Sequence, residues 1–127
     1  MLFIVKGRPA SVQSSRQNKA RWAAEVATAA KLKCPAPLAG NGLRIKITFY
    51  YNALPDFDSD NISKPICDAL NGITYADDHQ LADRVARRRD MGQPYVFRGI
   101  DPELAAAIAE GQEFVSVEID DANLGEL

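Results

Sequence analysis

Residues 43–50 read L-R-I-K-I-T-F-Y, and this stretch decides the fold class. Apolar side chains occupy every second position: Leu43, Ile45, Ile47 and Phe49. Because successive residues of a strand point to opposite faces of the sheet, this alternation predicts a strand with one buried face. It is the clearest strand signal in the chain.

The segment that follows this strand is expected to be a helix from about residue 61 to residue 71. Ile62, Ile66 and Leu70 recur every four residues, so one face of the helix points inward. Gly72 comes next, at the position where a left-handed C-terminal cap is common. Pro65 lacks a backbone N–H and would forfeit about one helical hydrogen bond. The start of this helix is therefore expected to be late or irregular.

Similar patterns predict further elements on both sides of this pair. We expect strands at residues 2–5, 81–91 and 115–119, and helices at residues 18–31 and 101–111. The segment 81–91 also suits a helix, and a strand is the preferred interpretation. Residues 11–17 read as a polar loop, and the acidic end from Asp120 onward as a loose tail. The expected fold class is α/β (mixed α+β), with a small mixed sheet flanked by helices.

Length and composition limit the class of protein. At 127 residues the chain fits a single domain, which we assign to residues 1–120, with residues 121–127 as an acidic tail. Two cysteines and one histidine are too few for a disulfide framework or a Cys/His zinc site. No apolar run approaches the roughly 20 residues that cross a bilayer, and the first residues read as a strand instead of a signal peptide. A cytoplasmic setting without membrane contact is expected.

The charged residues are unevenly distributed. The net charge of −2 argues against binding nucleic acid through bulk positive charge. Basic residues nevertheless gather at positions 6–33 and 84–89, whereas acidic residues concentrate at positions 56–83. This distribution suits a polyanion that basic segments hold over carboxylates neutralised by metal ions. An ordinary solvated surface accounts for most clusters of this kind, and the charges alone do not decide between the two.

Carboxylates gather on both sides of the helix predicted at 61–71. In the stretch D-F-D-S-D, an extended backbone would point Asp56, Asp58 and Asp60 to one side. Asp77 and Asp78 form a second acidic pair, and a helix of about ten residues is only roughly 15 Å long, so a return loop could bring the two groups together. Oxygen ligands suit Mg²⁺ or Mn²⁺. A bound ion of this kind polarises a phosphodiester and lowers the pKa of a bound water.

Each of these residues also has an ordinary structural explanation. Lys64 could place positive charge beside a phosphate, but Lys64 and Asp68 also have the i,i+4 spacing of an exposed ion pair. Asp60 can cap the helix, and Asp77 and Asp78 can be turn residues. Spacing alone therefore leaves a metal site and these structural roles about equally supported.

The run D-S-D-N-I-S-K-P-I-C-D-A-L-N-G-I-T-Y-A-D-D-H-Q, residues 58–80, resembles the signature of the RusA-type Holliday-junction resolvases. The shared pattern is D-x-D-N-x-x-K, then D-A-L-N-G, then D-D-x-Q, and the N-terminal K-G-R-P is also similar to the family. The resemblance implies a homodimeric mixed α/β nuclease that resolves four-way DNA junctions by paired symmetric cuts with Mg²⁺ or Mn²⁺. By this resemblance Asp58, Asp60 and Asp78 match the family's essential carboxylates and metal ligands, and Lys64 matches its essential lysine.

The resemblance extends to residues with supporting roles. Asp77 matches the acid beside the last essential carboxylate and is a further candidate metal ligand, and Asp68 falls on a motif position with a positioning role. The expected DNA contacts are made by Lys6, Arg8, Arg16, Lys19 and Asn61. Such basic contacts would grip phosphates without reading base sequence. The loop S-V-Q-S-S-R-Q-N-K departs from the family pattern, which is richer in proline and basic residues.

These observations favour a magnesium-dependent endonuclease that resolves Holliday junctions. A nuclease for flaps or other branches would use the same chemistry. A non-catalytic module that binds branched DNA would bind a junction without a metal-dependent product. An acidic interaction protein with a structural cation would not bind a junction at all.

Overall fold

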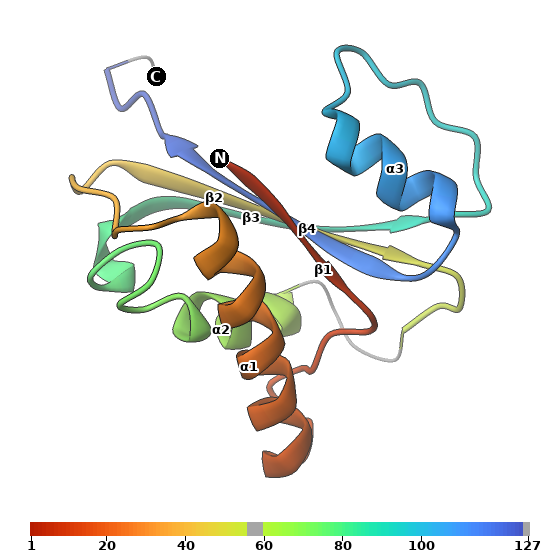
Figure 1. Ribbon diagram of the computed structural model, residues 1–127, viewed down its shortest axis with the longest axis horizontal. Coiled ribbons are helices and arrows are strands. Elements are labelled where there is room, and N and C mark those ends of the chain that lie inside the picture. Colours follow the sequence, from red (N-terminus) through yellow and green to blue (C-terminus); the bar gives the residue numbers. More distant parts are fainter. Residues whose placement is uncertain (56–59, 126–127) are drawn as a thin grey trace.

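The computed structural model describes residues 1–55 and 60–125, and of Asp60 it describes only the backbone. Within these residues the strands form one sheet in the order β1-β4-β2-β3. The strands are β1 (Leu2–Lys6), β2 (Leu43–Tyr51), β3 (Leu81–Asp90) and β4 (Phe114–Asp121). β4 is antiparallel to both β1 and β2, whereas β2 and β3 are parallel. This mixed sheet confirms the predicted fold class (Figure 1).

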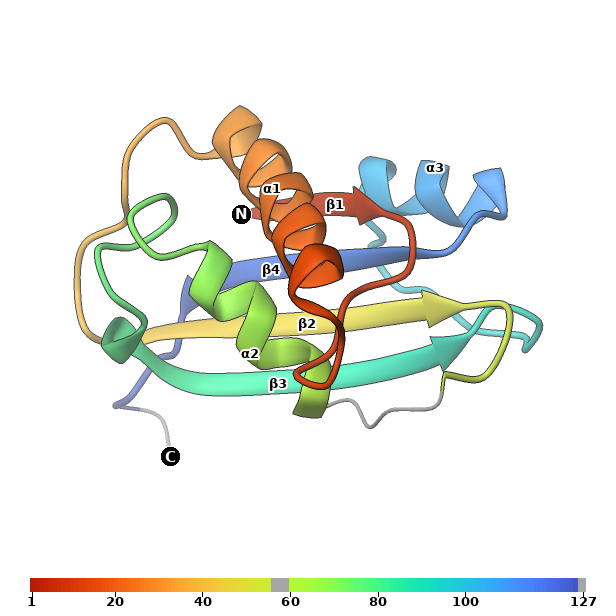
Figure 2. The same cartoon turned by 90° about the horizontal axis from the view of Figure 1, so that it is seen from below.

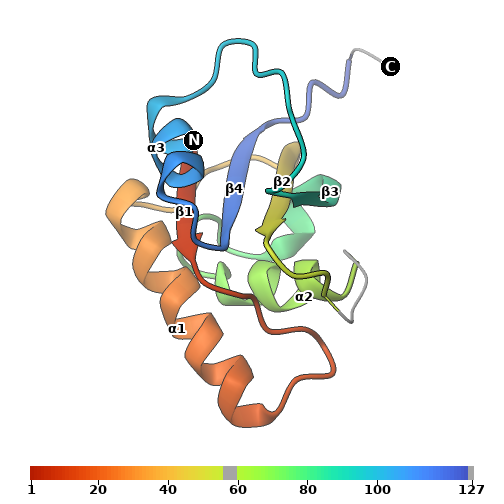
Figure 3. The same ribbon diagram turned by 90° about the vertical axis from the view of Figure 1, so that its right-hand side faces the viewer.

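Helices cover both faces of the sheet. α1 (Arg16–Lys33) and α2 (Asp60–Ala69) lie on one face, and α3 (Pro102–Glu110) lies on the other (Figures 1 and 3). The chain passes from β2 through α2 to β3, with a short 3₁₀ turn, η1 (Asp78–Gln80), directly before β3. Both stretches around α2 that carry the candidate carboxylates therefore belong to one β-α-β unit. None of the described helices is long and apolar enough to span a bilayer.

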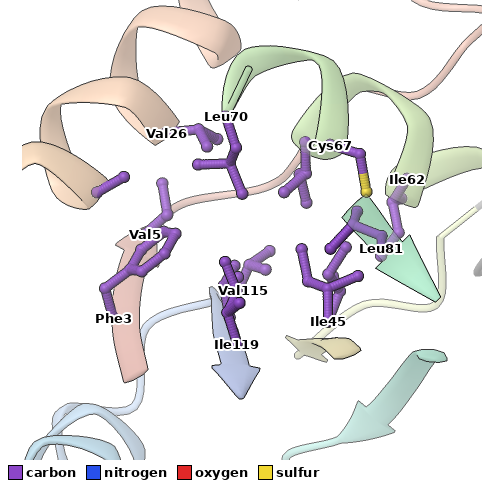
Figure 4. Packing of buried hydrophobic residues seen from close by; sticks show 14 of the residues in the cluster. Phe3, Val5, Val26, Ile45, Ile62, Cys67, Leu70, Leu81, Val115 and Ile119 are labelled. Atoms are coloured by element: carbon purple, nitrogen blue, oxygen red, sulfur yellow. The ribbon is translucent and has the colours of Figure 1, made fainter. Parts of the chain in front are cut away.

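The main core lies between the sheet and the α1–α2 layer. The side chains that alternate along β2 point into it, as predicted, and Trp22, Val26 and Ala30 of α1 are fully buried. Figure 4 shows Ile62, Cys67 and Leu70 descending from this layer onto the strands. Burial of large apolar side chains in this layer supplies most of the driving force for folding.

The loop before α1 is shorter than the sequence suggests. The predicted loop ran to residue 17, but α1 begins at Arg16 because the Ser15 hydroxyl accepts a hydrogen bond from the Asn18 N–H. A serine at the N-cap satisfies one of the free amides of the first turn. The prediction was therefore wrong for Arg16 and Gln17, which are helical.

Pro65 lies inside α2, and the structure shows how the helix tolerates it. The carbonyl of Asn61 would normally accept a hydrogen bond from residue 65, and proline has no N–H to donate. In its place the backbone N–H of Val12 donates to the Asn61 carbonyl at 3.1 Å. The helix therefore starts at Asp60, earlier than the proline suggested, and the loop before α1 is attached to it.

The ambiguous segment 81–91 is strand β3 over Leu81–Asp90, which confirms the preferred interpretation. β3 is an edge strand, paired only with β2 among the described elements, and Leu81 is its one buried residue. The loose tail predicted from Asp120 was wrong for its first residues. Asp120 and Asp121 extend β4 and pair with Arg44 and Leu43 of β2, and the Arg44 guanidinium also contacts the Asp120 carboxylate.

A smaller core lies under α3 on the opposite face. Asp101 caps this helix by accepting the Glu103 N–H, and Gly111 ends it at a φ of 78°. The Tyr50 and Phe114 rings stack with their centroids 4.6 Å apart, and apolar side chains of α3 pack against them. The helix predicted at residues 101–111 is confirmed over Pro102–Glu110, with the proline at its start and the glycine at its end that are common at these positions.

Candidate metal and DNA site

The turn that carries Asp77 and Asp78 is fixed by the buried side chain of Gln80. Its Oε1 accepts the N–H groups of Ala76 and Asp77, at 2.8 and 3.2 Å. Its Nε2 donates to the carbonyls of Leu38 and Gly40, at 3.0 and 2.7 Å. These bonds join η1 to the loop before β2, so the acidic pair sits on a turn with little freedom to move.

The two carboxylates of this turn lie beside each other at the surface. The Asp77 carboxylate accepts the His79 backbone N–H at 3.0 Å and lies 3.2 Å from His79 Nδ1. These bonds, together with the adjacent Asp78 carboxyl within hydrogen-bonding reach, lower the pKa of Asp77 below 3.8. Asp78 meets Arg84 in a long 3.5 Å contact. Asp77 therefore caps the turn, as the structural alternative held, and the Asp78 side chain beside it is 31% exposed.

Lys64 projects from α2 into solvent and pairs with Asp68 at 3.1 Å, the exposed i,i+4 pair that the spacing allowed. Its side chain remains 70% exposed, so this pair is easily exchanged for another anion. A groove between α1 and α2 is lined by Lys64, Pro65 and Lys19. The structure therefore brings Lys19 and Lys64 to the same groove.

The first turn of α2 is separated from η1. Asp58 lies outside the described residues, and Asp60 is the first residue of α2. In Figure 2 the first turn of α2 and the turn before β3 lie at different points along the length of β3. Asp78 acts electrostatically on Cys67, in the last half of α2. In the part of the chain that the structure describes, no three His, Cys, Asp or Glu side chains are grouped to hold a metal ion.

Two of the expected DNA-binding residues are held in ion pairs. Lys6 pairs with Glu110 at 3.1 Å at the surface. The Arg8 guanidinium donates to both carboxylate oxygens of Glu113, at 3.1 and 3.0 Å, and to the Ala53 carbonyl at 2.7 Å. Arg8 is thus tied to the protein itself, whereas the exposed Arg16 has no ion pair among the described residues.

Glu113 is a residue that the sequence gave no reason to select. It accepts both Arg8 contacts and the N–H groups of Asn52 and Ala53, at 2.7 and 3.3 Å. Burial alone would raise the pKa of Glu113, but the bonds from Arg8, Asn52 and Ala53 outweigh it and lower the pKa from 4.5. Glu113 thereby holds the first residues of the loop that leads from β2 to the acidic segment.

Gln80 differs from Glu113 in having a local signal. Asp77-x-x-Gln80 has the spacing of a capping box, in which the N-cap and third helical residues satisfy each other's amides, and the structure contains this box. Glu113 has no comparable signal, because its partners lie 60 and more residues away in the chain.

The β2-α2-β3 unit carries the acidic turn and the exposed Lys64, and the groove between α1 and α2 brings Lys19 of α1 close to Lys64. A family model described as endodeoxyribonuclease RusA matches residues 5–97. The chain belongs to the RusA family. The match contains β2, α2, η1 and β3, together with Lys64, Asp77 and Asp78.

RusA membership implies an endonuclease that acts on Holliday junctions. RusA nucleases are generally dependent on divalent metals. The comparison with curated proteins gives no match. The RusA match ends at residue 97, so α3 and β4 lie beyond it.

Proposed function

We propose that this protein is a homodimeric, Mg²⁺- or Mn²⁺-dependent nuclease that resolves four-way DNA junctions by paired, symmetric cuts. The proposal extends the RusA assignment to a metal, a set of residues and an assembly. One observation carries it: two carboxylates stand side by side on a turn fixed by Gln80. Their mutual repulsion is relieved by a cation, and magnesium in proteins commonly accepts one or two carboxylates together with water and phosphate oxygens.

Asp58, Asp60 and Asp78 are the proposed metal ligands, with Asp77 as the neighbouring acid. The donor set of oxygens alone fits a hard divalent cation. Such a cation, when bound, supplies a water of lowered pKa and stabilises the charge that builds on the phosphate. Gln80 and His79 fix the acidic turn through bonds that use the Asp77 oxygens and backbone, and the Asp78 side chain, which contacts Arg84 at 3.5 Å, remains 31% exposed.

Lys64 and Lys19 hold the DNA strand in this proposal. Because its pairing with Asp68 is exposed, the Lys64 ammonium can exchange that carboxylate for a phosphate oxygen without a large desolvation cost. Lys64 then provides a positive charge where negative charge develops during cleavage. Lys19, on the other side of the same groove, binds a neighbouring phosphate.

A two-fold dimer matches the symmetry of the substrate. A four-way junction can have two-fold symmetry, and two copies of the chain would present equivalent sites to two opposed strands. Within one copy the first turn of α2 is separated from η1 (Figure 2). A dimer can bring these two parts together from different copies. There the acidic segment of one copy can meet the acidic turn of the other.

Cleavage of a labelled synthetic four-way junction by Asp60→Asn tests the proposal. Asp60→Asn should retain junction binding and lose Mg²⁺-dependent cleavage. Asp83→Asn is the matched control, because Asp83 is an exposed carboxylate of β3 outside the proposed ligand set. Full activity of Asp60→Asn would refute its role.

The wild-type protein separates the rival functions in the same assay. Binding without any metal-dependent product would identify a non-catalytic branched-DNA module. Faster cutting of flaps than of junctions would identify a nuclease for other branches. Absence of junction binding would leave only an acidic interaction protein.

A further inference from the structure

A second surface, on the α3 face of the sheet, carries side chains of the types that bind nucleic acids. A pocket there is lined by Tyr50, Arg87, Arg89, Tyr95, Phe97 and Leu104. In the strand register Arg87 is opposite Thr48 and Arg89 is opposite Tyr50, so both arginines share the face of these buried β2 residues. The pocket therefore combines guanidinium groups with aromatic rings, on the face opposite α1 and α2.

Both arginines are held in place without being neutralised. Arg87 donates through Nε and Nη2 to the Thr48 hydroxyl, at 3.1 and 2.9 Å. Arg89 donates through Nη1 to the Arg88 carbonyl at 2.9 Å. Among the described residues neither forms an ion pair. Each guanidinium has more N–H donors than these contacts use, so both can bind an anion.

The carboxylates that flank pocket residues in the chain have other partners, and Glu118, which acts on Tyr50, pairs with Lys46 at 3.2 Å. Asp90 accepts the Gly92 N–H at 2.8 Å, and Asp101 caps α3. Glu103 pairs with Lys33 at 2.7 Å. The positive charge of Arg87 and Arg89 is therefore left for an external partner.

One side of the pocket is formed by apolar and aromatic side chains that are exposed to solvent. Val96 is 86% exposed and Phe97 is 42% exposed, next to a Tyr95 ring 6.3 Å from that of Phe97. The Tyr95 hydroxyl donates to the Asp90 carbonyl at 2.6 Å, which attaches the Tyr95 side chain to the end of β3. Adjacent exposed apolar side chains usually mark a binding surface.

The pocket lies at the end of the sheet where the chain leaves β2 and β3. Tyr51 and Asp90 pair at the ends of the parallel strands β2 and β3, and the Met91 N–H donates to the Tyr51 carbonyl. The chain after β2 and the loop carrying Tyr95 and Phe97 thus leave the sheet at the same end, where β2 and β3 finish. In sheets of this kind ligands gather beyond the carboxyl ends of parallel strands.

We propose that this pocket binds an unstacked base of branched DNA, with Tyr95 and Phe97 stacking on the base and Arg87 and Arg89 binding the adjacent phosphates. Bases next to a branch point are the easiest to unstack, and aromatic stacking accepts any base. The inference rests on the proposed function and adds to it a second DNA contact that favours branched over continuous duplex DNA.

Equilibrium binding without Mg²⁺, followed by fluorescence anisotropy over a range of salt, separates the two kinds of contact. Phe97→Ala should weaken junction binding about tenfold, leave the salt dependence unchanged and spare linear duplex. Arg89→Gln should reduce the slope of log K against log salt by about 0.7 to 0.9. Val96→Asp, at a largely solvated position, should also weaken junction binding, because it places negative charge beside the phosphates.

Two matched variants control for loss of apolar area and of charge. Leu32→Ala removes an exposed leucine of α1, and Arg44→Gln removes an arginine on the same face that pairs with Asp120. Both should bind the junction as the wild type does. A junction with 5-iododeoxyuridine beside the crossover should photocrosslink to Tyr95 or Phe97.

Normal junction binding by Phe97→Ala and Val96→Asp would overturn the inference while leaving the proposed function intact. A change in molar mass by light scattering, with DNA binding unaltered, would overturn it in favour of a contact between copies of the chain. Failure of the wild-type protein to bind any junction would refute the proposed function itself.

Discussion

The network centred on Glu113 offers a quantitative test of the structure. Glu113→Gln keeps the shape of the side chain and removes its charge, and it directs an amide N–H toward groups that are themselves donors. The four bonds concerned come from Arg8 Nε and Nη2 and from the N–H groups of Asn52 and Ala53. The glutamine can accept only part of this set.

The expected cost follows from the partial burial of the pair. Hydrogen bonds to charged groups contribute about 1.5 to 3 kcal/mol each when buried. The Glu113 side chain is 17% exposed and that of Arg8 is 39% exposed, so water replaces part of what is lost. We expect Glu113→Gln to lower the free energy of unfolding by about 2 kcal/mol and the Tm by roughly 5 to 10 °C.

The pH dependence of this difference has a definite sign. The pKa of Glu113 in the folded protein is lower than its ordinary value of 4.5. Its ionised form therefore stabilises the fold fully above the unfolded pKa, and this stabilisation is lost as the pH falls through the folded pKa. The difference between wild type and Glu113→Gln should be complete near neutral pH and shrink below pH 4.5.

Urea unfolding at several pH values measures this difference, and hydrogen exchange at Asn52 and Ala53 reports on the loop directly. Both amides should exchange faster in Glu113→Gln. Glu110→Gln is the matched control, because its pair with Lys6 is more exposed, and it should change stability by less than about 0.5 kcal/mol. Equal stability of Glu113→Gln and wild type at neutral pH, or a difference that does not vary with pH, would refute the reasoning.

Three further outcomes are expected. Lys64→Ala should leave the urea midpoint nearly unchanged, because its pair with Asp68 is exposed, yet slow junction cleavage about 100-fold; a parallel loss of stability would indicate a structural role. Pro65→Ala should stabilise the protein by less than about 1 kcal/mol in urea unfolding, well short of the usual ~3 kcal/mol, because Val12 already occupies the Asn61 carbonyl; a gain near the full value would contradict that account. A mixed dimer of Asp60→Asn and Asp78→Asn copies should regain cutting of one strand of the junction if the acidic segments of different copies meet, and no cutting would place each site within one copy.

Much of the fold could be read from local patterns. The alternation along residues 43–50 and the four-residue spacing of Ile62, Ile66 and Leu70 each place apolar side chains on one face of a single element. The signature at residues 58–80 pointed to the RusA family, which the match over residues 5–97 confirms. These signals succeed because strand and helix periodicity are encoded within a few neighbouring residues.

The sequence was least informative where an element is exposed or a residue pairs at long range. β3 has few buried side chains, so the sequence pattern of residues 81–91 fitted a helix as well as a strand. Its pairing with β2 shows that it is a strand. Lys6 and Arg8 looked like free DNA contacts, but their carboxylate partners arrive from more than 100 residues away. No local pattern contains such a partner.

The sequence by itself determined the order and type of most elements and the residues of the candidate chemistry, because secondary structure and motif identity depend on near neighbours. Tertiary structure alone decided that the Asn61 carbonyl accepts the Val12 N–H, because Pro65 has none to donate. It also decided that Glu113 fixes the loop after β2. In addition, it decided that the first turn of α2 and the turn before β3 lie at different points along β3 (Figure 2). These contacts depend on which segments the order of the strands brings together, and the spacing of residues along the chain does not reveal that order.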